Sequence, residues 1–288
     1  MLLRVYGESF ASHVQCFGSL ALTLQVRGGF TVDQRSLTDI KSVDHGKYIL
    51  LHFACLTKDK IVGTSLDEYL STNRMMSEVT REAADRVGVD RIFFVSSGAV
   101  YGALQSAVSS ESANPYATIK LEDEAHFKEF AHGRARRKVL TVRLFNLSGP
   151  YINKLGSYAL SSFIEQARKQ DVDTTIRINA GRPVIRSYVG VGNLLDVAFA
   201  RLLDDTSESY ECFDTAGERE VEVLELAETV RRLVNPSVSI VRPQFSHSPI
   251  DRYVGDGTRF RSLAQGYGIS LHDLNQQVSD TADYLGAS

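Results

Sequence analysis

The chain is organised around two neighbouring segments, Phe93-Phe94-Val95-Ser96-Ser97-Gly98-Ala99-Val100-Tyr101-Gly102 and Asn114-Pro115-Tyr116-Ala117-Thr118-Ile119-Lys120. The first begins with an apolar run that predicts a buried strand, and it continues into a turn that contains two serines. The second opens a helix, because Pro115 has a fixed φ and no donor to lose in a first helical turn. Tyr116 and Lys120 are four residues apart, so they share one face of that helix.

These segments bring together a hydroxyl, a phenol and an ammonium group. A lysine beside a tyrosine favours the phenolate, and we expect it to lower the tyrosine pKa toward the pH at which proton transfer operates. Ser97, at the end of the predicted strand, can hydrogen-bond the same substrate oxygen. The set predicts proton transfer at a carbinol or carbonyl. A chance Tyr-x-x-x-Lys, with the tyrosine packed and the lysine solvated, is the alternative, but here the pattern follows a strand, a Ser-Ser pair and a loop.

Ser97, Tyr116 and Lys120 resemble the catalytic triad of the short-chain dehydrogenase/reductase superfamily, and the flanking sequence is similar to its extended branch, the nucleotide-sugar epimerases and dehydratases. The resemblance implies an α/β fold, a Rossmann-like doubly wound parallel sheet with a smaller C-terminal α/β substrate lobe. It implies a dinucleotide-binding domain over residues 1–150 and a mainly substrate-binding lobe over residues 151–288. The two are expected to interleave, because some later segments return to the sheet.

Composition narrows the class of protein. The 288 residues are 43% hydrophobic and 23% charged, which is ordinary for a globular protein with a substantial core. The net charge of -3 argues against nucleic acid or an anionic membrane as a partner. No apolar run approaches the roughly 20 residues of a membrane helix, and residues 1–5 are too few for the apolar region of a signal peptide, so we expect a cytoplasmic protein. Cys16, Cys55 and Cys212 are widely spaced and fit neither a disulfide framework nor a metal site.

The N-terminal part follows the order of elements in a dinucleotide-binding fold, in a degenerate form. Residues 2–6 predict a strand, apolar residues from Val14 to Leu24 predict a helix, and residues 30–33 predict a strand that ends in an acid. In such folds the turn after the first strand approaches the pyrophosphate, and the acid binds the ribose. The predicted cofactor contacts in this part are Gly7, Ser9, Phe10, Ala11 and Asp33.

The identity of the dinucleotide depends on the residues near the end of the second strand. Asp33 favours NAD over NADP, because a carboxylate accepts from the ribose 2′-hydroxyl and repels a 2′-phosphate. Arg35 lies close enough to keep NADP as an alternative. Residues 33–47 are polar and short, where extended members of the superfamily usually have a further strand and helix.

The apolar run of residues 47–55 predicts a parallel strand covered on both faces. It resembles the family's strand that ends in His-Leu-Ala-Ala, which implies that Phe53 and Ala54 lie against the cofactor. We interpret His52 as a hydrogen-bonded core residue rather than a base.

Residues 67–87 predict an amphipathic helix. The resemblance implies that Asn73 on this helix supports the active site and counts among the cofactor contacts, together with Tyr116 and Lys120. A solvated asparagine is the alternative. The resemblance also implies a homodimer, formed through the helices of residues 67–87 and 116–130.

The segment after Lys120 predicts the end of the helix and the next strand. The basic residues 134–138 are expected to lie at the helix end and to face water. Residues 139–146 predict a strand, and Arg143, Asn146 and Pro150 fit the family's Arg-x-x-Asn-x-x-Gly-Pro segment. The resemblance implies that Asn146 contacts the sugar nucleotide.

The last third of the chain resembles the substrate lobe of the family. Helices are predicted near residues 158–168, 221–233 and 274–285, and Asn193 is expected to cap another. Arg186 matches the arginine that reaches a nucleotide diphosphate, a role that suits its rigid fork of donors; a surface salt bridge is the alternative. We expect Arg252 to pair with Arg186 on the phosphates. The predicted substrate-binding residues are Ser97, Asn146, Arg186 and Arg252.

Three functions compete for this set of residues. In a nucleotide-sugar 4-epimerase, the favoured reading, a nicotinamide takes hydride from the sugar while Tyr116 takes the hydroxyl proton, and the 4-keto intermediate turns before hydride returns. A ketoreductase would use the same residues once, on a 4-keto sugar. Dehydration needs a further acid and base after the catalytic serine, where this chain has Gly98 and Ala99. A non-catalytic cofactor-sensing or scaffold protein with a decayed site is the third alternative.

Overall fold

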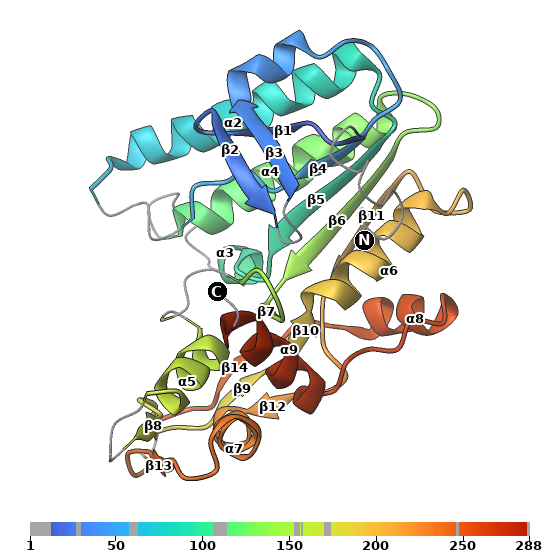
Figure 1. Ribbon diagram of the computed structural model, residues 1–288. Coiled ribbons are helices and arrows are strands. Elements are labelled where there is room, and N and C mark those ends of the chain that lie inside the picture. Colours follow the sequence, from blue (N-terminus) through green and yellow to red (C-terminus); the bar gives the residue numbers. More distant parts are fainter. Residues whose placement is uncertain are drawn as a thin grey trace. The chain divides into compact units, whose positions relative to one another are not determined.

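The computed structural model describes residues 13–26, 30–57, 63–105, 114–152, 156, 158–169, 174–245 and 248–286. The chain divides into two compact units (Figure 1). The first unit consists of Met1–Thr141 and Leu202–Cys212, and the second of Val142–Arg201 and Phe213–Ser288. The predicted domain boundary at residue 150 stays a prediction.

The main sheet has four strands in the order β11-β6-β5-β4. β4 pairs with β5 in parallel, with Leu50 opposite Ile92. Phe93 and Phe94 in β5 are buried, as expected for a strand covered on both faces. The predicted α/β class with a parallel sheet is therefore confirmed. The strands are β4 (Ile49–His52), β5 (Arg91–Ser97), β6 (Lys138–Leu144) and β11 (Tyr210–Asp214).

Two long helices, α2 (Leu66–Val87) and α4 (Pro115–His132), lie side by side along this sheet (Figure 1). α2 is closed at both ends: the Ser65 side chain accepts from the Glu68 N–H, and Gly88 adopts the left-handed conformation with φ 79°. In α4 the Asn114 side chain accepts from the Ala117 N–H, and proline occupies the first turn. Both predicted helices are confirmed, and the short helix α3 (Val100–Gln105) precedes α4.

The N-terminal helix predicted from Val14 to Leu24 is wrong. The structure has strands there, β1 (Cys16–Gly18) and β2 (Leu22–Val26), which flank β3 (Phe30–Ser36) in a sheet of order β1-β3-β2. Leu22 and Leu24 alternate with Thr23 and Gln25, a period of two that suits a strand. β3 also continues past Asp33, where the predicted strand ended. The short helix η2 (Leu37–Ser42) follows β3 and packs against α2.

Arg137 differs from the expectation that residues 134–138 face water. Its side chain is buried, with an exposed fraction of 4%. The guanidinium group pairs with the Asp85 carboxylate, donates to the Phe130 carbonyl at 3.0 Å and lies 3.8 Å from the centre of the Phe130 ring. A buried charge persists only when it is paired and hydrogen-bonded, and α2 supplies the partner that the local sequence could not reveal.

The second unit contains several small sheets. β9 lies between β12 and β14, β10 pairs with β7, and β13 pairs with β8. Helices α5, α7 and α9 contribute buried residues to one hydrophobic core, among them Ile164, Leu226 and Val278. The elements are β7 (Asn146–Ser148), α5 (Ala159–Ala167), β8 (Thr175–Arg177), β9 (Val184–Arg186), β10 (Tyr188–Gly190), α6 (Val191–Leu203), β12 (Val221–Glu222), α7 (Val223–Val234), β13 (Ser239–Val241), β14 (Asp251–Tyr253), α8 (Thr258–Gly266) and α9 (Leu274–Gly286).

Asn193 does not cap a helix as expected. It lies inside the first turn of α6, which begins at Val191. Its side-chain amide donates to the Ser270 carbonyl at 3.0 Å, and its side-chain oxygen accepts from the His272 N–H at 2.8 Å. Asn193 therefore fixes the loop before α9. Of the helices that the structure describes, none is both long and apolar enough to cross a membrane.

Candidate active site

Tyr116 and Lys120 lie on the first two turns of α4. Because Asn114 caps the helix and Pro115 is its first residue, the start of α4 is fixed at this point. Tyr116 is half-buried and Lys120 is buried. Four residues apart, they project from the same side of the helix.

Lys120 reaches from α4 to the end of β5. Its ammonium group donates to the Val95 carbonyl at 3.0 Å and lies 4.9 Å from the centre of the Phe94 ring. An ammonium group has three donors and one position is taken by Val95. The side chain therefore places a fixed positive charge beside the carboxyl end of β5.

Ser97 is the last residue of β5 and is buried. Its hydroxyl oxygen accepts from the Ala99 N–H at 3.2 Å, in the turn that leads into α3. Because this contact uses the oxygen as an acceptor, the hydroxyl proton remains available for donation. The structure therefore places all three predicted catalytic residues at the adjoining ends of β5 and α4.

The segment that follows β4 lies at the same edge of the sheet, where doubly wound folds bind their ligands. Asn73 holds this segment: its side-chain oxygen accepts from the Leu56 N–H at 2.8 Å, and its amide donates to the Tyr69 carbonyl at 3.0 Å. The Tyr69 hydroxyl donates to the Leu56 carbonyl at 2.7 Å. Phe53 is exposed and Ala54 half-buried. Asn73 is thus a buried support of the chain beside the predicted cofactor contacts, and the solvated alternative is wrong.

His52 closes β4 in a buried aromatic environment. Its ring stacks on Phe94 at 5.8 Å between centroids and contacts Phe127 at 5.2 Å. Burial, and secondarily the positive charge of Lys120, lower the pKa of His52 to about 3. His52 Nε2 has no hydrogen-bond partner among the described residues, so the predicted core placement is confirmed and the predicted hydrogen bond is not found at this atom.

The predicted contacts at the adenine end are only partly described. Gly7, Ser9, Phe10 and Ala11 lie outside the described residues. Asp33 lies in the middle of β3, and its carboxylate accepts from the Thr23 hydroxyl at 2.8 Å. The prediction that Asp33 binds the ribose therefore lacks the strand-end position on which it was based.

Arg35 is two residues further along β3 and also has internal contacts. Its guanidinium group donates to the Gln15 side chain at 2.9 Å and lies 4.5 Å from the centre of the Phe17 ring.

Asn146 and Arg186, two predicted substrate contacts, lie in the second unit. Asn146 begins β7, which pairs with β10 in parallel, and its amide donates to the Ser187 carbonyl at 3.3 Å. Arg186 ends β9 and is half-buried. Its Nη1 donates to the carbonyl and to the carboxylate of Asp251, each at 3.0 Å. That carboxylate orients the guanidinium group, and the hydrogen bond from Arg186 is the main cause that lowers the pKa of Asp251.

Arg252 does not join Arg186 as expected. In the sheet β12-β9-β14, Arg252 is opposite Ile185 and Tyr253 is opposite Arg186. Side chains alternate along a strand, so Arg252 and Arg186 project from opposite faces. Arg252 pairs instead with the Glu220 carboxylate. The expectation that both arginines grip one diphosphate is corrected by this register.

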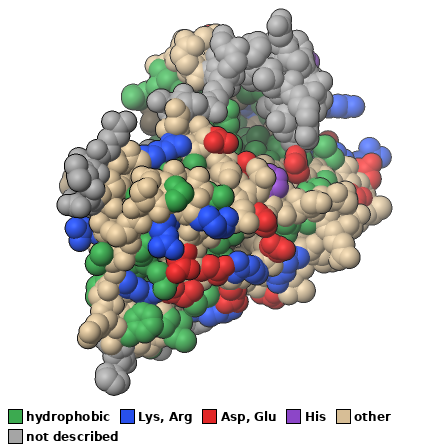
Figure 2. All heavy atoms as spheres, turned by 60° about the horizontal axis from the view of Figure 1, so that its bottom comes forward, with side chains coloured by type: hydrophobic (Ala, Val, Ile, Leu, Met, Phe, Trp, Pro, Cys, Tyr) green, Lys and Arg blue, Asp and Glu red, His purple; other side chains and the backbone are tan. Residues whose placement is uncertain are grey.

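Charged side chains gather on the face of the second unit that Figure 2 brings forward, where basic and acidic groups lie next to one another. The ion pairs recorded for this unit are Arg182–Asp251, Arg186–Asp251, Arg219–Glu225, Arg242–Glu222, Arg252–Glu220 and His272–Asp280. Most are exposed or half-exposed, so each contributes little to stability.

Two buried serine–carboxylate pairs were missed by the sequence reasoning. The Ser96 hydroxyl donates to the Glu124 carboxylate, and the Ser77 hydroxyl donates to the Asp123 carboxylate, each at 2.6 Å. Burial is the main cause that raises the pKa of Asp123 to about 6. A signal was present, since Asp123 and Glu124 follow Lys120 by three and four residues and so share its buried helix face.

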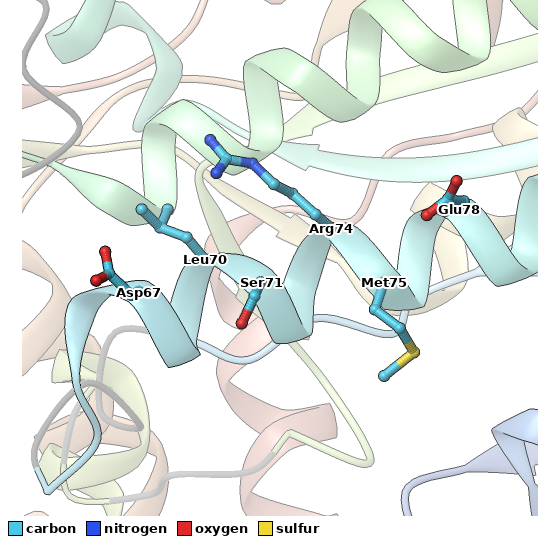
Figure 3. Close-up of a pocket in the computed structure, with 6 residues that line it drawn as sticks. All are labelled: Asp67, Leu70, Ser71, Arg74, Met75 and Glu78. Carbon is cyan, nitrogen blue, oxygen red and sulfur yellow. The ribbon is translucent and has the colours of Figure 1, made fainter.

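A hollow of about 390 Å³ lies along α2 (Figure 3). It is lined by Asp67, Leu70, Ser71, Arg74, Met75 and Glu78. All six residues belong to the helix that is predicted to form part of a dimer, and the hollow is separate from the predicted catalytic residues. The dimer stays a prediction.

The chain resembles known proteins in both sequence and fold. The sequence model of the NAD dependent epimerase/dehydratase family matches residues 22–213. The chain is 27% identical over 189 residues to a UDP-glucose 4-epimerase of Azospirillum brasilense, covering 60% of this chain and 54% of that protein. It is 28% identical over 202 residues to UDP-glucuronic acid decarboxylase 5 of Arabidopsis thaliana, covering 66% and 57%. The matched part spans little more than half the length of these relatives.

Solved structures share the fold at low sequence identity. A UDP-glucose 4-epimerase from Stenotrophomonas maltophila, with bound NAD and formylated UDP-arabinopyranose, has a TM-score of 0.66 at 19% identity and covers 87% of this chain and 79% of its own. RMD from Pseudomonas aeruginosa, complexed with NADPH, has a TM-score of 0.65 at 21% identity and covers 83% and 81%. Both likenesses concern the fold alone.

Proposed function

The chain belongs to the NAD dependent epimerase/dehydratase family, and from this premise we propose that it is an NAD-dependent nucleotide-sugar epimerase that oxidises its substrate transiently at C4. The observation that carries the proposal is the position of Lys120. Its buried ammonium group is held by the Val95 carbonyl, one helical turn from Tyr116 and at the end of the strand that Ser97 closes. This arrangement supports one proton-transfer site.

Each of these residues has a separate task at the sugar hydroxyl. Tyr116 takes the proton during oxidation and returns it during reduction, as a general base and then a general acid. The fixed charge of Lys120 favours the phenolate form that takes the proton. Ser97 donates its free hydroxyl proton to the same oxygen, since its own oxygen already accepts from Ala99.

The residues at the nicotinamide end fit a dinucleotide. The segment after β4 is fixed from behind by Asn73, and the small side chain of Ala54 leaves room beside the edge that carries Ser97 and Tyr116. When bound, the nicotinamide supplies the acceptor and then the donor of hydride. We propose NAD, with Phe53 and Ala54 on its nicotinamide side and Asn73 supporting them through the chain at Leu56, and NADP as the alternative.

The second unit is proposed to hold the nucleotide diphosphate of the sugar. Arg186 supports this role because Asp251 already orients its guanidinium group, which leaves its remaining donors for phosphate oxygens. Asn146 is proposed as a contact to the sugar nucleotide. Arg252 is assigned to a different place, because it lies on the other face of the sheet.

A single reduction of a 4-keto sugar is the second candidate function. It would use Ser97, Tyr116 and Lys120 once, with the cofactor exchanged after each turnover. Two observations support this alternative. RMD, which shares the fold, was solved with NADPH, and Arg35 lies close to Asp33 in the sequence.

The test begins with the nucleotide released from denatured purified protein, measured by absorbance and mass spectrometry. Retained NAD is the result expected for an epimerase, because its cofactor is regenerated within each turnover. The protein is then incubated with a panel of UDP-sugars without added cofactor, and the products are separated by chromatography. We expect one sugar to be converted to its 4-epimer. Turnover that requires added NADPH would indicate the reductase, and absence of both binding and turnover would indicate a decayed site.

A further inference from the structure

Two side chains on α4 bind two successive residues of β5. Lys120 donates to the Val95 carbonyl at 3.0 Å, and Glu124, one helical turn later, accepts from the Ser96 hydroxyl at 2.6 Å. The residue that comes next on β5 is Ser97. The helix that carries Tyr116 is therefore held to the strand that carries Ser97 by two contacts, one and two helical turns after Tyr116 and directly before Ser97.

The Ser96–Glu124 contact is closed to solvent. Ser96 has an exposed fraction of 2% and Glu124 of 7%. A hydroxyl that donates to a carboxylate at this distance forms a short, charge-assisted hydrogen bond. Removal of this donor takes a hydrogen bond away from a buried carboxylate, which costs free energy. The pair therefore ties the two elements together through groups that are already paired with each other.

We propose that Ser96 and Glu124 are positioning residues that set the geometry between Ser97 on β5 and Tyr116 on α4. The predicted effect on catalysis rests on the proposed function. The fastening of β5 to α4 rests on the described contacts alone. Adjacent serines then divide two tasks, because Ser96 holds the strand to the helix and Ser97 serves the substrate oxygen.

The Ser96–Glu124 contact matters for catalysis because proton transfer is sensitive to the distance between the reacting groups. Ser97 has to be within hydrogen-bond reach of the oxygen on which Tyr116 acts. A displacement of about 1 Å at a reacting group can reduce the rate about 100-fold. A loosened Ser96–Glu124 contact would therefore lower kcat more than it raises KM.

Ser77 supplies a matched control. Its hydroxyl also donates to a buried carboxylate of α4, that of Asp123, at the same distance of 2.6 Å. The two serines lie on different elements: Ser77 is on α2, whereas Ser96 is on β5 beside Ser97. Ser96→Ala and Ser77→Ala thus remove chemically equal contacts from the same helix.

We expect both alanine variants to lower Tm by comparable amounts. Only Ser96→Ala is expected to reduce kcat, by about 10- to 100-fold with a small change in KM. Ser96→Thr keeps a hydroxyl donor and Glu124→Gln keeps a side-chain acceptor, so both should have a kcat close to that of the parent. These two variants keep the test valid if Ser96→Ala folds poorly. Equal kcat in the two alanine variants, or no recovery in the two conservative variants, would overturn the proposal.

A measurement without turnover separates this proposal from the proposed function. Hydrogen exchange of the intact protein, followed by mass spectrometry, reports the turn in which the Ala99 N–H donates to Ser97. Faster exchange in peptides covering residues 97–102 is expected in Ser96→Ala and not in Ser77→Ala. If the parent protein converts no nucleotide sugar, this difference still supports the positioning role while the epimerase proposal fails. Unchanged exchange in Ser96→Ala would refute the positioning role whatever the activity.

Discussion

At the scale of single residues, the proposed mechanism depends most on the phenol of Tyr116. Lys120 is buried and anchored to the Val95 carbonyl, so its charge has a fixed position one helical turn from Tyr116. The proposed chemistry requires that the phenol exchanges its proton while its position remains unchanged. Removal of the hydroxyl alone therefore tests the mechanism without removing the ring.

Tyr116→Phe is expected to lower kcat by about 10²–10⁴-fold, the usual contribution of positioned acid–base catalysis. The ring packing and the cap at Asn114 remain, so Tm and the amount of retained dinucleotide should stay near those of the parent. Steady-state kinetics with the converted UDP-sugar measures the effect, and Tyr48→Phe, also half-buried, is the control that should leave kcat unchanged. Full activity in Tyr116→Phe would eliminate the proposed proton transfer.

His52 makes stability depend on pH. Its pKa is lowered to about 3 in the folded protein, first by burial and then by Lys120, whereas an unfolded chain has a histidine pKa of about 6.5. The unfolded state thus binds a proton that the folded state excludes. The stabilisation is fully present above pH of about 6.5 and is lost as the pH falls from there toward 3.

His52→Leu is expected to remove this acid dependence. In the parent, His52 should decrease the free energy of unfolding by about 1 kcal/mol for each pH unit below about 6. Asp123 acts in the opposite direction, because its pKa is raised to about 6 and its protonation on acidification stabilises the fold. The test therefore compares the free energy of unfolding of the parent with that of His52→Leu at each pH. Urea unfolding from pH 7.5 to 4.5 measures it. His132→Gln, at an exposed site, should keep the slope of the parent, and an unchanged slope in His52→Leu would contradict the argument.

At the scale of elements, local sequence was sufficient wherever one pattern dominated. The apolar run before Ser97 gave β5, Asn114 and Pro115 gave the start of α4, and the predicted helix of residues 67–87 differs from α2 by one residue. The prediction for the N-terminal segment failed because its apolar residues fit both a helical period near four and a strand period of two. Pairing with β3 in the folded chain selected the strand.

Several side chains have roles that depend on long-range contacts, which the local sequence does not predict. Asn193 has the residue type of a cap, but its partners lie 77 and 79 residues away, at Ser270 and His272. Arg137 belongs to a basic run, yet it is neutralised by Asp85 on another helix. Ser96 and Glu124 are 28 residues apart. In each case the role depends on a neighbour that only the folded chain brings close.

Helix α9 is expected to depend on one buried polar residue. The Gln277 side chain accepts from the Ser148 hydroxyl at 2.6 Å and donates to the His272 carbonyl at 2.8 Å. Gln277→Leu keeps the size but leaves both partners unsatisfied, which should lower the free energy of unfolding by about 1–3 kcal/mol. Chemical denaturation measures the loss. Gln276→Leu, on the exposed side of α9, should change stability by less than about 0.5 kcal/mol, and equal values for the two variants would refute this role of Gln277.

At the scale of the whole molecule, we expect a homodimer formed through α2 and α4. Arg74 and Glu122 join these helices within the chain at 2.7 Å, and Met75 on α2 is 45% exposed beside the hollow of Figure 3. Met75→Asp should shift the mass measured by light scattering from dimer to monomer. Val241→Asp places the same charge at an exposed apolar residue of β13 and should leave the mass unchanged. A parent protein that is monomeric at all concentrations would exclude this assembly.

The small sheet β12-β9-β14 shows that backbone alignment can decide how many positive charges a surface offers to an anion. A slip of β14 along β9 by one residue would move every one of its side chains to the opposite face, bringing Arg252 to the side of Arg186 and removing Tyr253 from it. The register of β14 on β9 therefore decides how many arginines share one face, in addition to the number of arginines in the chain. A change of this register would give the same set of arginines a different charge on each face of the sheet.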